Sequence, residues 1–247
     1  MEKIEIEKEN EKDIITSTSE LRVSQIINLT GLKKVVGARV KKSHLDAPPI
    51  CLSLSCDMSQ ATLLKENENK KNAGKIHITF TDIIIRAAAQ AIKLNKLLNA
   101  SINEDENTIV LYEDITIGIA TNTNKSLLVP VIQNTEKLEL EEIALSRDKL
   151  LNRVRNGKYT IEDISDGTFT ITNLGMFGIE SFEPIISLGQ SAILSIGLIK
   201  NTPVIDEFGK IYIRSIMVVS VTCDHRVVDG ADTAKFLNDF KRIIEEK

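Results

Sequence analysis

The chain has 247 residues, of which 42% are hydrophobic, so it is long enough for one large domain or two small ones with a substantial core. Its formal net charge of −4 excludes the basic surface that nucleic-acid-binding proteins use. No apolar run approaches the roughly 20 residues that span a bilayer, so no membrane contact is expected.

The N-terminal segment and the cysteines favour a cytoplasmic protein. Residues 1–20 are rich in acids and lysines and resemble neither a secretory signal nor a transit peptide. We interpret them as a charged leader or linker remnant outside the fold. Cys51, Cys56 and Cys223 lack metal-ligand spacing, and three cysteines in apolar runs are typical of reduced, buried thiols. No metal is expected.

Residues 21–247 are expected to form one domain, because no proline-rich or glycine/serine-rich linker divides them. The pattern first predicts a strand over 23–29, a helix that Thr30 caps and that runs to Val40, and an alternating strand over 50–57. The polar stretch 65–75 predicts an exposed loop. A largely buried helix begins at Thr81 and Asp82 and continues to Leu97.

Strands dominate the rest of the chain. They are predicted over residues 108–112, 115–120, 127–132, 168–172, 191–199 and 210–223, with helices over 140–154 and 233–244. Strands and helices do not alternate regularly, and no glycine-rich nucleotide loop occurs. The pattern therefore favours a two-layer α/β sandwich, with a mixed β-sheet flanked by helices, over a Rossmann fold.

A histidine follows the most apolar strand. His225 lies where the strand over 210–223 ends and the last helix begins, with Asp229 four residues later. One interpretation is a structural histidine that is hydrogen-bonded at the strand end, and the other is a general base held at the wall of an active site. Asp229 can cap the last helix, or it can pair with a cation and fix the loop that carries His225.

A second segment carries alternating hydroxyls. Thr168, Thr170 and Thr172 share one face of a strand, and Thr172 is the last of them before a glycine-containing turn. β-branched threonines favour strands without any function. Alternatively, the Thr172 hydroxyl points into a cleft, where it could donate to a developing oxyanion.

Two motifs carry a family resemblance. Residues 224–230 read Asp-His-Arg-Val-Val-Asp-Gly, and residues 167–175 read Gly-Thr-Phe-Thr-Ile-Thr-Asn-Leu-Gly. Both resemble the signatures of dihydrolipoamide acyltransferases, the E2 components of 2-oxo acid dehydrogenase complexes. The opening helix, residues 28–40, and the stretch over 184–194 extend the resemblance over nearly all of 21–247. Leu188-Gly189 replaces a Pro-Pro of the family, and Thr172 stands where many members have serine.

The resemblance implies a chloramphenicol acetyltransferase-like fold and thioester exchange between coenzyme A and dihydrolipoamide. It implies that His225 is the base, that Thr172 stabilises the oxyanion and that Asp229 supports the site. It also implies a homotrimer in which His225 and Thr172 meet across the subunit interface. Such trimers assemble into 24-mer or 60-mer cores, whose partners are a lipoyl domain and the E1 and E3 components. No residue is assigned to coenzyme A.

Several alternatives remain open. Acetyl is the default acyl group, as in pyruvate and acetoin dehydrogenase complexes, while succinyl or branched-chain specificity also fits. The chain could instead be an O-acetyltransferase of the chloramphenicol acetyltransferase type or a non-catalytic scaffold subunit. No lipoyl domain or subunit-binding domain is recognised. In the related chloramphenicol acetyltransferases an arginine near the position of Lys33 pairs with the aspartate that matches Asp229, and Lys33 could form a similar pair.

The last helix also allows two interpretations. Its apolar residues Phe236, Phe240 and Ile244 could form contacts between trimers, or they could pack on the sheet of their own chain.

Overall fold

A six-stranded mixed sheet forms the centre of the molecule. The computed structural model describes residues 24–123 and 126–246. The strands lie in the order β1-β10-β9-β8-β4-β7. Their bounds are β1 Pro49–Asp57, β4 Ile117–Ile119, β7 Val131–Ile132, β8 Phe169–Asn173, β9 Ala192–Ile205 and β10 Ile211–Asp224. Strand β8 runs parallel to β9 and β4, and the other neighbours are antiparallel. The predicted α/β class with a mixed sheet is confirmed.

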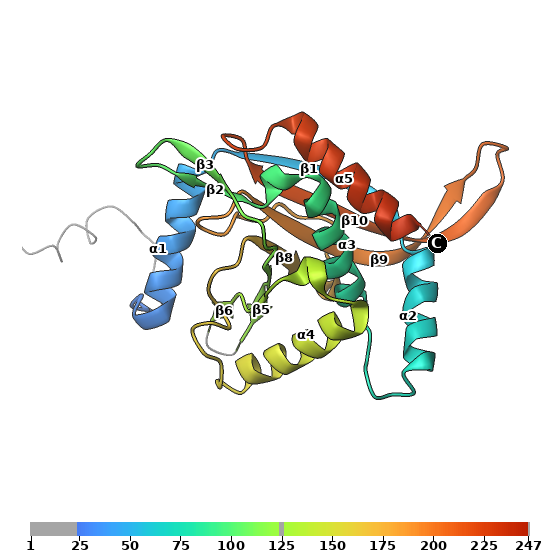
Figure 1. Ribbon diagram of the computed structural model, residues 1–247, viewed down its shortest axis with the longest axis horizontal. Helices are drawn as coiled ribbons and strands as arrows, with labels where there is room; N and C mark the ends of the chain where they lie inside the picture. Colours follow the sequence, from blue (N-terminus) through green and yellow to red (C-terminus); the bar gives the residue numbers. More distant parts are fainter. Residues whose placement is uncertain (1–23, 124–125, 247) are drawn as a thin grey trace, which may run out of the picture.

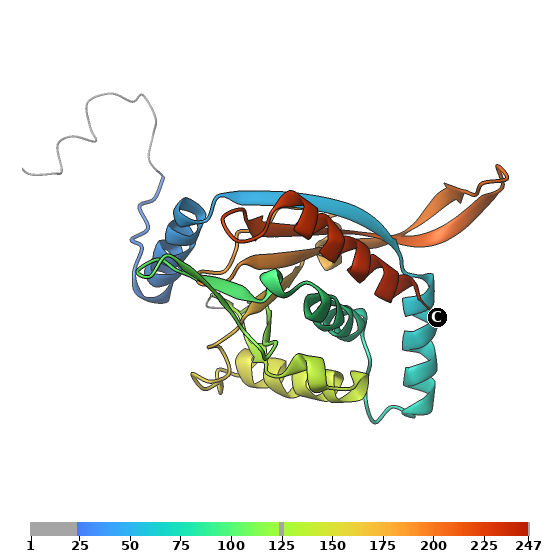
Figure 2. The same cartoon turned by 45° about the horizontal axis from the view of Figure 1, so that its top comes forward.

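Helices cover one face of this sheet (Figures 1 and 2). Helices α3 (Phe80–Leu94) and α5 (Gly230–Glu245) pack together there, and α4 (Leu140–Arg155) lies over α3. Helices α1 (Gly31–Asp46) and α2 (Ser59–Lys71) stand at opposite ends of the molecule in Figure 1. The smaller elements are the hairpins β2 (Ala100–Asn103) with β3 (Thr108–Leu111) and β5 (Thr121–Asn122) with β6 (Leu127–Leu128), and the short helices η1 (Lys96–Leu98), η2 (Thr135–Lys137) and η3 (Gly175–Phe177). In the part of the chain described, no helix is long and apolar enough to cross a membrane.

The core lies between the sheet and these helices. Phe169 of β8 and Phe236 of α5 are fully buried, with ring centroids 5.9 Å apart. Phe240 and Ile244 are buried in the same cluster. The apolar stripe of α5 therefore packs on its own sheet, the second of the two alternatives for these residues.

The opposite face of the sheet carries hydroxyls. The strand register aligns Ser53, Ser220, Ser195 and Thr172 as one row across four strands. Within this row the Ser53 hydroxyl donates to Ser220 Oγ at 2.7 Å. The Ser195 hydroxyl donates to the carbonyl of Phe182 at 2.9 Å, so the segment after η3 covers part of this face. Residues directly paired across strands share a face, and Thr172 is therefore the end member of a polar row.

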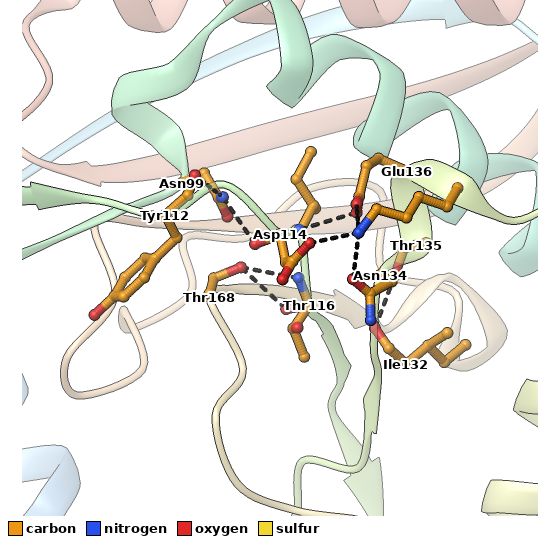
Figure 3. A network of polar contacts seen from close by, with 11 residues as sticks. Asn99, Tyr112, Asp114, Thr116, Ile132, Asn134, Thr135, Glu136 and Thr168 are labelled. Carbon is orange, nitrogen blue, oxygen red and sulfur yellow. Dashed lines mark hydrogen bonds and ion pairs between the residues drawn. The ribbon is translucent and has the colours of Figure 1, made fainter.

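A network of polar contacts anchors the chain as it enters β4 (Figure 3). The Asn99 side-chain amide donates to the carbonyls of Tyr112 and Asp114, at 2.9 and 3.1 Å. Glu136 accepts from the backbone N–H of Ile115, and Thr168 Oγ1 accepts from the N–H of Thr116 at 3.0 Å. The network fixes the short strand β4 beside the start of β8, the strand that ends at Thr172 and Asn173.

Several predictions of local structure were wrong or incomplete. Thr30 precedes α1 but makes no capping hydrogen bond through its side chain, and this helix runs on to Asp46. Residues 24–30 form no strand, because no strand edge pairs with them, and Ile26 and Ile27 remain exposed. The predicted loop over 65–75 is mostly helix α2: its lysines and glutamates are good helix formers, and only Ala61 is buried. The predicted strand over 127–132 is split at Val129 and Pro130 into β6 and β7.

The long hairpin β9–β10 extends beyond the body of the molecule, on the side away from α1 (Figures 1 and 2). Ile205 pairs with Ile211, and Ile213 lies two residues further on the same face. These three side chains are 65–71% exposed, and Phe208 at the tip is 86% exposed. This apolar arm has no covering segment among the described residues. The leader, residues 1–20, lies outside the described residues.

Candidate active site

The turn between β10 and α5 holds His225 firmly while leaving its side chain exposed. The backbone N–H of His225 donates to the carbonyl of Pro48 at 2.9 Å, and the N–H of Asp224 donates to the carbonyl of Ser191 at 2.8 Å. The backbone N–H of Val227 and that of Val228 each donate to the carbonyl of Asp224 at 2.9 Å. An imidazole on such a turn can meet a substrate without rearrangement of its backbone, as a general base requires.

Asp229 begins helix α5. Its carboxylate accepts the backbone N–H of Asp232 at 2.8 Å, which makes it the N-cap. That hydrogen bond, together with the N–H of Ala231 and the charge of Lys235, lowers the pKa of Asp229 below its ordinary value. Among the described residues no ion pair joins Asp229 to Lys33, which is exposed on α1. The capping role expected of Asp229 is present, and within the described residues of one chain Asp229 does not pair with Lys33.

Thr172 lies on the hydroxyl face near the end of β8. It is partly exposed, and within the described part of the chain its hydroxyl has no hydrogen-bond partner. By contrast, the Thr170 hydroxyl on the same face donates to Gln190 at 2.7 Å. The turn after Thr172 is closely packed: a Cβ at Gly175 would lie 2.5 Å from the carbonyl oxygen of Gly197. The Thr172 hydroxyl is thus available as a hydrogen-bond donor, and the backbone that carries it is held in place by close packing.

The strand register keeps Thr172 and His225 of one chain apart. Thr172 lies beside Ser195, and Ser195 lies beside Ser220. His225 follows Ser220 by five residues, or about 17 Å of extended strand. Two strand spacings add about 10 Å across the sheet. The two side chains are therefore too far apart to act on one reacting carbonyl within a single chain.

The residues on either side of His225 are joined by contacts that the sequence indicates only in part. Arg226 forms a forked contact with the buried Asp224 carboxylate and a further contact with Glu104 of the β2–β3 turn. Only the alternation of charges in Asp-His-Arg could have indicated the first contact, and nothing in the sequence indicates the second. In the described ranges, no group of three or more His, Cys, Asp or Glu side chains is placed to hold a metal ion.

Comparison with known proteins places the chain in a family. The model of the 2-oxoacid dehydrogenases acyltransferase catalytic domain matches residues 22–247. The chain belongs to this acyltransferase family. It is 34% identical over 241 residues to the dihydrolipoyllysine-residue acetyltransferase component of the acetoin cleaving system of Bacillus subtilis, covering 96% of the chain and 59% of that protein.

A second relative has a different acyl group in its name. The succinyltransferase component of the 2-oxoglutarate dehydrogenase complex of Rickettsia typhi is also 34% identical, over 95% of the chain and 58% of that protein. The chain therefore spans a little over half the length of these two acyltransferases.

Solved structures confirm the fold. A probable dihydrolipoamide acetyltransferase from Listeria monocytogenes has a TM-score of 0.84 and 29% identity, covering 90% of this chain and 94% of that one. A chloramphenicol acetyltransferase has a TM-score of 0.50 and 14% identity, covering 89% and 99%. The second likeness shows the fold alone, and it confirms the chloramphenicol acetyltransferase-like architecture expected for this acyltransferase family.

Proposed function

We propose that this chain exchanges an acetyl group between coenzyme A and dihydrolipoamide, as the catalytic domain of an E2 component. The observation that carries the proposal is the exposed His225 on a turn held by backbone hydrogen bonds, in a chain of the acyltransferase family. Residues 21–247 form the catalytic domain in this proposal, and residues 1–20 are a charged leader or linker remnant outside it.

His225 acts as the base in the proposed reaction. A free thiol titrates near about 8.5 and is mostly protonated at neutral pH, whereas the thiolate is the nucleophile. An imidazole, with an ordinary pKa of about 6.5, takes the thiol proton and returns it to the departing thiolate. The attacking sulfur forms its bond to the acyl carbon, and the other carbon–sulfur bond breaks when the tetrahedral intermediate collapses.

Thr172 stabilises that intermediate. The carbonyl oxygen becomes an oxyanion when the thiolate adds, and a preorganised donor lowers the energy of this state more than that of the substrate. The Thr172 hydroxyl suits this role because no other group among the described residues occupies it. Asp229 serves indirectly: as the cap of α5 it fixes the end of the turn that carries His225.

The site is completed by a second copy of the chain. His225 and Thr172 are too far apart within one chain, so each reacting carbonyl lies between His225 of one copy and Thr172 of the next. The uncovered apolar arm at Ile205, Phe208 and Ile211 supplies a surface for such contacts. We propose a homotrimer that assembles further into a 24-mer or 60-mer core, with a lipoyl domain and the E1 and E3 components as partners.

The test is transfer from acetyl-CoA to free dihydrolipoamide. Wild type should form S-acetyl-dihydrolipoamide, and His225→Ala should lose about 10²–10⁴-fold in rate because the base is gone. His77→Ala is the matched control, since His77 is also exposed but lies before α3. A wild-type chain that is inactive with acetyl-, succinyl- and branched-chain acyl-CoA would exclude the proposal.

Succinyl transfer is the second candidate. It is favoured by the 34% identity to the Rickettsia typhi succinyltransferase component, which equals the identity to the Bacillus subtilis acetyltransferase component. The same assay with succinyl-CoA separates the two: a higher kcat/KM for succinyl-CoA than for acetyl-CoA would replace the acetyl assignment and leave the chemistry unchanged.

A further inference from the structure

A buried carboxylate lies directly beside His225. Asp224 is the last residue of β10 and only 3% exposed. Burying a carboxylate is costly unless a counter-charge and hydrogen bonds compensate for the lost water. The Asp224 carboxylate can therefore stay buried at this place only if other groups compensate its charge.

Arg226 supplies that compensation. Its Nη2 donates to Asp224 Oδ2 at 2.7 Å, and its Nε donates to Oδ1 at 3.0 Å, a fork that matches the carboxylate geometry. The backbone N–H of Arg226 also donates to Oδ1 at 3.0 Å. Among the described residues, every hydrogen bond to this carboxylate comes from Arg226. In return, the Asp224 carboxylate raises the pKa of Arg226.

His225 lies between Asp224 and Arg226 in the sequence. Its backbone N–H is bonded to Pro48 on one side, and the carbonyl of Asp224 accepts the N–H groups of Val227 and Val228 on the other. The forked pair thus closes the same turn that the backbone bonds define. If the guanidinium is removed, the Asp224 carboxylate loses its side-chain donors among the described residues, and the turn that carries His225 loses the pair that closes it.

We propose that Arg226 is a positioning residue, which holds His225 in its reactive place by neutralising the buried carboxylate of Asp224. This inference rests on the proposed acyl transfer, and it assigns to Arg226 a role that acts through His225. The second contact of Arg226, to Glu104 at 3.1 Å, is largely exposed. It therefore contributes little, because exposed ion pairs are screened by water.

The experiment compares Arg226→Met with the double variant Asp224→Asn, Arg226→Met. Methionine keeps the apolar stem and leaves the carboxylate unpaired, so kcat should fall by about 10²-fold while KM for acetyl-CoA is unchanged. The double variant removes both charges, and most of kcat should return, because a pair replaced as a whole leaves no buried charge. Glu104→Gln should keep the wild-type kcat.

A second readout does not depend on activity. The chain has three histidines, His44, His77 and His225, so their modification by diethyl pyrocarbonate can be followed separately by mass spectrometry. In Arg226→Met the labelling rate of His225 should change several-fold, while that of His77 stays constant. If wild type transfers no acyl group, the proposed function fails, and the labelling still decides the role of Arg226.

The inference is overturned if Arg226→Met keeps the wild-type kcat, if its His225 is labelled at the wild-type rate, or if the double variant is as slow as the single one. Should Arg226→Met fail to fold, Arg226→Lys takes its place. Lysine keeps the charge without the fork, so it should show an intermediate kcat, and a full wild-type kcat with unchanged labelling would overturn the proposal.

Discussion

The two faces of the central sheet differ in what they contribute, and strand β8 shows the difference within a few residues. Phe169 and Ile171 point into the helix-covered core, whereas Thr170 and Thr172 point to the hydroxyl face. Residues of one strand face separate neighbourhoods because side chains alternate. The apolar face should therefore determine stability, and the hydroxyl face should carry the chemistry on a backbone that the core holds rigid.

Phe169→Ala should have the largest effect on stability. The ring is fully buried against Phe236, and its loss leaves a cavity that costs about 3–5 kcal/mol of unfolding free energy. Denaturant unfolding measures this loss. A cost below about 1 kcal/mol would show that the apolar face does not dominate stability.

Thr172→Val should have a large effect on catalysis. Valine keeps the shape and removes the donor, so kcat should fall by about 10²–10³-fold with the unfolding midpoint unchanged. Thr172→Ser retains a hydroxyl and should retain most of kcat. Equal rates for the valine variant and wild type would remove Thr172 from the mechanism.

Thr170→Val tests the neighbouring hydroxyl on the same face. Thr170 is buried and bonded to Gln190 and Ser187, so its loss leaves polar partners unsatisfied and costs about 1–3 kcal/mol in unfolding free energy. Acyl transfer by the folded variant should stay near that of wild type. A loss of kcat as large as that of Thr172→Val would show that the face as a whole, and not Thr172, matters.

The cysteines divide between the faces in the same way. Burial raises the pKa of Cys56 and of Cys223 to about 12. Burial also raises the pKa of Cys51, but this thiol is only partly buried and remains the most accessible of the three. Because the thiolate is the reactive form, a thiol reagent at pH 8 should modify Cys51 of the native protein first. Mass spectrometry after timed labelling checks this order, and equal rates for all three thiols would contradict it.

Asp229→Ala should give the smallest change. The native pKa of Asp229 is lowered, so its contribution to stability is present above the ordinary value of about 3.9 and is lost as the pH falls through the native pKa. The difference in urea midpoint between wild type and this variant should therefore shrink from pH 7 to pH 3. Asp229→Asn keeps a capping oxygen and should remain close to wild type at neutral pH. A difference that grows toward low pH would contradict the capping role.

Much of this architecture could be predicted, because alternation and capping are local. The face of Thr172 follows from period two in β8, and the role of Asp229 as a cap follows from its place before Gly230. The fork between Arg226 and Asp224 depends on how the turn closes, and the row from Ser53 to Thr172 depends on strand order. The sequence around these residues does not determine either feature, because both depend on how distant segments come together. The segment over 24–30 was mispredicted because a strand needs a partner edge, which a single sequence does not reveal.

The most direct test of the central claim mixes two inactive chains. His225→Ala and Thr172→Val chains with different tags are co-expressed, and assemblies that contain both are purified and assayed for acetyl transfer. If each site joins His225 of one copy to Thr172 of another, about a quarter of the sites in a random mixture carry neither change, and activity returns well above that of either parent. If both residues act within one chain, every site carries a lesion and the mixture stays as inactive as its parents.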